Sequence, residues 1–172
     1  MPHAYLISQI IGVCAMVCAI ISYQLKTQRA IFFTLCGASF LWAMSYLVLG
    51  NAAGCAINLL SIVRSVIYSF HEKKWVRSPV TMIVWEVIFI IATVLTWENI
   101  FTVLPLISAV ITGYCMWQEN TAKLKILTVP SSACWLIYNI RFRQTVGAVN
   151  ECMVLASIAV YFIRTHKKEK IQ

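Results

Sequence analysis

The sequence predicts an all-α membrane protein whose seven transmembrane helices form two parallel three-helix repeats joined by a linker helix. Three observations lead to this fold class: an apolar composition, seven long apolar runs and a weak internal repeat. Of the 172 residues, 60% are hydrophobic and 12% are charged. Soluble domains carry about 25% charged residues, so this composition excludes an ordinary globular domain, a disordered chain and a disulfide scaffold.

Seven apolar runs have the length of about 17–25 residues that a helix needs to cross a bilayer. They cover residues 4–24, 30–49, 52–71, 79–97, 99–117, 122–140 and 147–165. The connections between them are short. Residues 49–52 indicate a tight turn, and Ser78 followed by Pro79 is typical of a helix start with the serine as its N-cap.

Basic residues gather on one side of the predicted membrane. Eleven of them lie in alternate gaps and in the C-terminal tail, namely Lys26, Arg29, Lys73, Lys74, Arg77, Lys123, Lys125, Arg164, Lys167, Lys168 and Lys170. Only Arg141 and Arg143 lie on the other side. Short loops rich in Lys and Arg stay in the cytoplasm, which predicts an outside N-terminus and a cytoplasmic C-terminus in the bacterial inner membrane. The net charge of +8 is thus explained by topology and lipid headgroups rather than by nucleic acid.

A shift of 93 residues aligns the two halves of the chain without a gap. The aligned pairs include Trp42 with Trp135, Gly54 with Gly147, and Asn58 with Glu151. The shift predicts a first repeat in residues 1–78, a linker helix in 79–97, a second repeat in 98–165 and a cytoplasmic tail in 166–172. Because both repeats would start outside, an axis along the membrane normal relates them. Transporters built from repeats place the solute between the repeats, near mid-membrane.

Polar and aromatic residues at one depth form the candidate solute site. They are Trp42, Asn58, Trp135, Asn139, Asn150 and Glu151. At 1.5 Å per residue these side chains lie roughly 10 Å below the outer surface. An aromatic plane can stack on a hydroxylated or heterocyclic solute while amide and carboxylate groups orient it. The alternatives are an outer aromatic belt for the two tryptophans and helix-to-helix hydrogen bonds for the amides.

Three ionisable residues lie inside the predicted spans. Glu151 is a candidate for contacting the solute or for coupling transport to protons, because an ionisable group within a membrane is expensive; a wet residue at the outer mouth is the alternative. Arg64 and Glu86 fall at equal depth on consecutive helices, which predicts an ion pair. That pair would serve either as a structural clamp or as a gate.

Residues that weaken helices recur in the two halves. Gly12, Gly37, Pro105 and Pro130 are candidate hinges for alternating access, with simple packing as the alternative. The seven cysteines lie inside apolar runs and form no CxxC pair. They are interpreted as reduced packing residues, and we expect no metal, cofactor or catalytic residue.

The second half carries the residues of a family resemblance. The stretch Cys134-Trp135-Leu136-Ile137-Tyr138-Asn139, followed by Gly147 and Glu151, resembles the YgjV-type bacterial inner-membrane proteins. The arrangement of three spans, a linker span and three spans is similar to SWEET and PnuC transporters. The SWEET resemblance implies a sugar facilitator with Asn58 at the substrate. Glu151 departs from that pattern, whereas the PnuC resemblance implies vitamin precursors and keeps a heterocyclic solute open.

The sequence therefore predicts a transporter or facilitator of a small polar solute, either a sugar or a vitamin-like heterocycle, with proton coupling as one hypothesis. The alternative is a non-transporting accessory or sensor protein of the membrane. An enzyme is not expected, since no nucleophile and base occur at one depth. The expected partners are the solute, the lipid bilayer and a second copy of the chain in a homo-oligomer. A polar cavity between the repeats would separate a transporter from a packing subunit.

Overall fold

A computed structural model describes most of the chain. Its backbone is described for residues 2–22, 28–70, 72–118 and 121–169, and its side chains for residues 3–21, 33–70, 72–117 and 126–160. The predictions for Lys26, Arg29, Lys123, Lys125 and the basic residues from Arg164 onward concern side chains outside these ranges.

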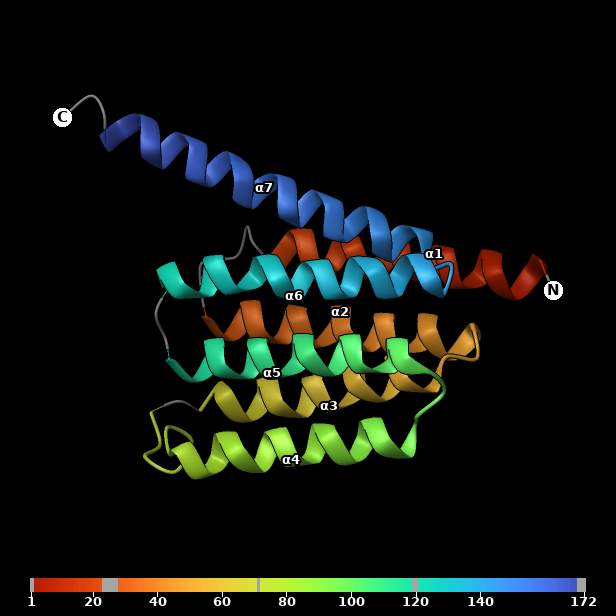
Figure 1. The fold of residues 1–172 in the computed structure, drawn as a ribbon, viewed down its shortest axis with the longest axis horizontal. Helices are drawn as coiled ribbons and strands as arrows, with labels where there is room; N and C mark the ends of the chain where they lie inside the picture. Colours follow the sequence, from red (N-terminus) through yellow and green to blue (C-terminus); the bar gives the residue numbers. More distant parts are fainter. Residues whose placement is uncertain (1, 23–27, 71, 119–120, 170–172) are drawn as a thin grey trace.

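Within the described residues the fold consists of seven α-helices, one short 3-10 helix and no strand. The helices are α1 (Pro2–Ser22), α2 (Gln28–Val48), α3 (Ala52–Tyr68), α4 (Pro79–Leu95), α5 (Val103–Gln118), α6 (Thr121–Arg141) and α7 (Thr145–Glu169), with η1 (Ile100–Thr102) before α5. Consecutive helices run in opposite directions, so the two termini lie at opposite ends of the bundle (Figure 1). The prediction of an all-α fold with seven helices is confirmed.

The helix starts follow from local capping. Gly50 has a φ of +74°, a left-handed conformation that suits glycine and makes the predicted tight turn. Asn51 then caps α3 by accepting a 2.8 Å hydrogen bond from the Gly54 amide. Ser78 caps α4, with Pro79 at its first position as predicted. Asn99 caps η1 with a capping box.

Two helix ends differ from the ends of the predicted apolar runs. The fifth run, 99–117, agrees with the membrane-length segment Ile100–Trp117, but this segment consists of η1 followed by α5, which begins at Val103, so Pro105 lies in the first turn of α5 rather than in its interior. A proline there breaks no helical hydrogen bond, because the first amides of a helix have no internal acceptor. At the other end, α7 continues to Glu169 through most of the expected tail, since no glycine or proline stops it.

Six helices form a closed ring around the centre of the bundle. Each helix of the ring contacts the next one in the order α1, α2, α3, α5, α6, α7, and α7 contacts α1 to complete the ring. Helix α4 lies outside the ring and packs against α3 and α5. In Figure 1 it forms the edge of the bundle opposite α7.

The outer surface of the bundle is apolar. Leu95 is 79% exposed, Phe33 73% and Ile100 69%. Large exposed apolar surfaces are rare in soluble monomers, but they are favourable in contact with lipid. Among the described residues, His3–Ile21 and Ile100–Trp117 are long and apolar enough to cross a membrane, and four other apolar helices are shorter.

Candidate functional site

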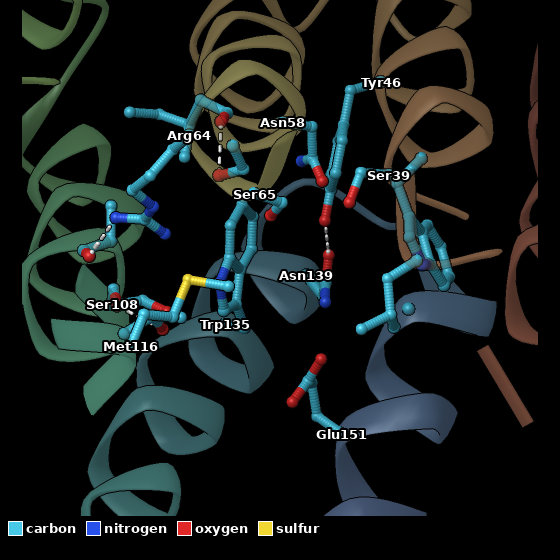
Figure 2. Close-up of a pocket in the computed structure, with 17 residues that line it drawn as sticks. Ser39, Tyr46, Asn58, Arg64, Ser65, Ser108, Met116, Trp135, Asn139 and Glu151 are labelled. Atoms are coloured by element: carbon cyan, nitrogen blue, oxygen red, sulfur yellow. Dashed lines mark hydrogen bonds between the residues drawn. The ribbon is translucent and has the colours of Figure 1, made fainter. Parts of the chain in front are cut away.

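A polar cavity of about 250 Å³ lies inside the ring. Five helices line it: α2, α3, α5, α6 and α7. Its wall consists of Leu35, Ser39, Trp42, Tyr46, Ile57, Asn58, Ser61, Arg64, Ser65, Ser108, Ala109, Thr112, Met116, Trp135, Asn139, Gly147 and Glu151. Figure 2 shows these side chains converging on one space.

Five of the six predicted solute residues line this cavity. They are Trp42, Asn58, Trp135, Asn139 and Glu151. The two tryptophans are only partly exposed and line the cavity.

Asn150 does not line the cavity. Successive residues of a helix point about 100° apart, so its neighbour Glu151 reaches the cavity and Asn150 does not. The Asn150 amide instead donates a 3.2 Å hydrogen bond to the Glu151 carboxylate.

The cavity wall includes the amide oxygen of Asn58 and the carboxylate of Glu151 as hydrogen-bond acceptors. The Asn58 amide nitrogen donates to the Gly54 carbonyl of its own helix at 2.8 Å, which leaves the amide oxygen for other partners. The Glu151 carboxylate accepts a hydrogen bond from the amide of Asn150, which is uncharged. In Figure 2 it points from α7 towards Asn139.

A hydrogen bond between α2 and α6 separates this cavity from a second hollow. The Tyr46 hydroxyl donates to the Asn139 amide oxygen at 2.5 Å, and both residues are buried. Asn139 also lines a hollow at the end of the bundle where α2 meets α3 and α6 meets α7. We call the Tyr46–Asn139 contact the partition.

Two further sets of buried hydrogen bonds close the bundle beside the partition. The Tyr138 hydroxyl donates to Asn51 at 2.6 Å. The Gln144 amide donates to Ser45 and to Ser8, and the two serine hydroxyls contact each other at 2.9 Å. These residues were not among the predicted site residues. Ser45 and Tyr138, like Asn51 and Gln144, are polar residues 93 positions apart, so the repeat spacing could have found these four. The counterpart of Ser8 is Phe101, so the spacing could not have found Ser8.

Two glycines pack directly against the two residues of the partition. A Cβ at Gly54 would lie 2.8 Å from Cγ of the Tyr46 ring, and a Cβ at Gly147 would lie 2.8 Å from Cγ of Asn139. Real Cβ atoms do not approach other atoms so closely, so both positions require glycine for the partition to keep its geometry.

Arg64 and Glu86 meet at a third glycine. Arg64 is 2% exposed, donates to the Ala109 carbonyl at 2.6 Å, and lies 4.6 Å from the centroid of the Phe89 ring. A Cβ at Gly113 would overlap Glu86 Oε1 and lie 3.1 Å from Arg64 Nη1.

Arg64 and Glu86 both approach Gly113 and interact through their charges, but the described residues show no salt bridge between them, so the predicted ion pair stays a prediction. Among the described residues, Arg64 Nε and Glu86 Oε2 find no hydrogen-bond partner. Arg64 thus ties α3 to both α4 and α5, and it also lines the cavity. Glu86 does not reach the cavity wall.

The candidate hinges differ in their surroundings. Pro130 lies inside α6 as predicted, whereas Pro105 lies in a first turn. A Cβ at Gly12 would lie 3.3 Å from both Trp42 and Val146, so packing explains this glycine. A Cβ at Gly37 would have no neighbour within 4 Å.

The fold and the site define a class: an all-helical membrane protein with a polar cavity inside a helix ring. The family model Imp-YgjV, described as a bacterial inner membrane protein, matches residues 6–169. The chain therefore belongs to this family and to the bacterial inner membrane. No curated protein and no solved structure match it.

Proposed function

We propose that this protein transports a small polar solute across the bacterial inner membrane. The cavity inside the helix ring is the observation that carries the proposal. A packing subunit would fill this space with side chains, whereas a transporter needs it for its solute. Aromatic rings, amides, hydroxyls and a carboxylate line the cavity, as expected for a site that orients a polar molecule.

The proposal includes two parallel repeats related by an axis through the cavity. Helices α2 (28–48) and α6 (121–141) differ by 93 at both ends, and α3 and α7 start 93 residues apart, at 52 and 145. The partition joins residues 46 and 139, which also differ by 93.

Hydrogen bonds beside the partition give further support to the repeats. In the 93-residue repeat, Ser45 corresponds to Tyr138 and Asn51 corresponds to Gln144. The proposed axis therefore relates two hydrogen bonds to each other: the one from Tyr138 to Asn51 and the one from Gln144 to Ser45. A two-fold relation between the halves predicts this exchange, which unrelated helices would match only by chance.

Transport would proceed by opening the partition. In this conformation the hydrogen bonds of the partition and its neighbours hold α2 and α6 together beside the cavity. The distribution of basic residues assigns the end of the bundle where α2 meets α3 to the outside of the cell. Separation of α2 from α6 would break the Tyr46–Asn139 bond and admit the solute from that side. The seven helices would then each cross the membrane, with the N-terminus outside.

Glu151 is the proposed coupling group. A carboxylate in a membrane cavity has a lower free-energy cost when it binds a proton or a cation than when its charge is unpaired. Glu151 can therefore bind a proton while the cavity faces one side and release it on the other.

Transport by purified protein in proteoliposomes tests the proposal. We expect uptake of at least one compound from a panel of sugars and heterocyclic vitamins, measured against empty liposomes. Glu151→Gln should abolish accumulation driven by a pH gradient and leave exchange at equilibrium intact. Glu98→Gln is the matched control, because Glu98 is an exposed carboxylate outside the cavity. Absence of uptake and exchange for every compound would favour the accessory or sensor role.

A further inference from the structure

The negative charge of Glu151 has no positive partner in the described part of the protein. The Glu151 carboxylate accepts a hydrogen bond from the uncharged amide of Asn150. Arg64 is the one basic side chain on the cavity wall, and it is held by the Ala109 carbonyl and the Phe89 ring rather than by Glu151. The wall of the cavity therefore contains a carboxylate that no positive side chain neutralises by a salt bridge.

Three aromatic rings line the same cavity. Tyr46 stacks on Trp135 with ring centroids 5.9 Å apart, and Trp42 lies 6.5 Å from Tyr46. The faces of tryptophan and tyrosine rings attract cations, above all ammonium groups removed from water.

A solute with an ammonium group satisfies both features. An unpaired carboxylate in a low-dielectric site is costly, and a bound cation removes that cost. A metal ion fits this site less well than an organic cation, because the described residues contain no group of three acidic, histidine or cysteine side chains able to coordinate one. The free amide oxygen of Asn58 adds a further acceptor for an N–H donor.

We propose that the cavity binds small organic cations, with Glu151 as the counter-ion and Trp42, Tyr46 and Trp135 as the aromatic walls. This proposal rests on the proposed transport function and names its substrate class. At about 30 Å³ per water molecule, the volume of about 250 Å³ corresponds to roughly eight waters. The solute is therefore a compact amine or quaternary ammonium compound rather than a nucleotide or a lipid.

The test compares cations with uncharged molecules of the same shape. The first pair of probes is choline and 3,3-dimethylbutan-1-ol, and the second is isoamylamine and isoamyl alcohol. Binding is measured by calorimetry on the full chain in nanodiscs, with empty nanodiscs as the baseline. We expect the Kd of at least one cation to be tenfold or more below that of its uncharged partner. This comparison uses the unmodified protein and needs no variant to fold.

Variants then assign the preference to the cavity. Glu151→Gln should reduce the difference within the pair to less than threefold, whereas Glu98→Gln should preserve it. Equal binding within both pairs, no binding of either cation, or a preference that survives Glu151→Gln overturns the proposal.

Uptake of the same probes separates this inference from the transport function. If liposomes take up a sugar or a neutral heterocycle while both cations are excluded and unbound, transport stands and the organic-cation site is wrong. If the cations bind in a Glu151-dependent manner but no compound enters the liposomes, the site stands and the transport function is wrong.

Discussion

The charges of Arg64 and Glu86, which both approach Gly113, give a prediction about stability. Arg64→Met removes a buried charge, its 2.6 Å hydrogen bond to the Ala109 carbonyl and its contact with the Phe89 ring. A hydrogen bond from a charged group contributes about 1.5–3 kcal/mol. Because Glu86 is only partly buried, we expect Arg64→Met to lower the free energy of unfolding by about 1.5–3 kcal/mol.

Glu86→Gln keeps the shape of the side chain but leaves the guanidinium without its counter-charge, so it should also destabilise. In the double variant neither charge is stranded, and the loss should fall below the sum of the two single losses by about 0.5–3 kcal/mol. Glu98→Gln, an exposed change, should alter stability by less than about 0.5 kcal/mol.

The assay is reversible unfolding by sodium dodecyl sulfate in dodecyl maltoside micelles, followed by circular dichroism. Single losses that add exactly to the double loss would refute the electrostatic coupling. Transport by the double variant then decides between the two roles. A clamp predicts normal uptake once the protein is folded, whereas a gate predicts altered uptake at unchanged stability.

The glycines provide a second prediction. Gly54→Ala should destabilise by about 1–3 kcal/mol, since its Cβ would press on the Tyr46 ring. Gly37→Ala is the matched control and should stabilise by about 0.5–1 kcal/mol, since its Cβ would meet nothing within 4 Å. Topology provides a third: alkaline phosphatase should be active when inserted at Asn51 and inactive when fused after Gln172. Activity at Gln172 would reverse the assigned orientation.

Features set by local chemistry were determined by the sequence alone. The number of helices, the tight turn at Gly50 and the start of α4 at Ser78–Pro79 follow from apolar runs and capping residues. Helical hydrogen bonds and caps join residues a few positions apart, so a single chain segment contains the information. It was also predictable that the residues of the candidate site would lie at one level of the bundle, because rise along a helix depends only on residue number.

Rotation and packing between helices were decided only by the tertiary structure. Asn150 and Glu151 share a depth, yet only Glu151 faces the cavity, because helix packing sets which side of α7 turns inward. The partition between Tyr46 and Asn139, and the place of Gly113 beside Arg64 and Glu86, join separate helices. Such contacts depend on how side chains of neighbouring helices fit together, which no periodicity within one helix specifies.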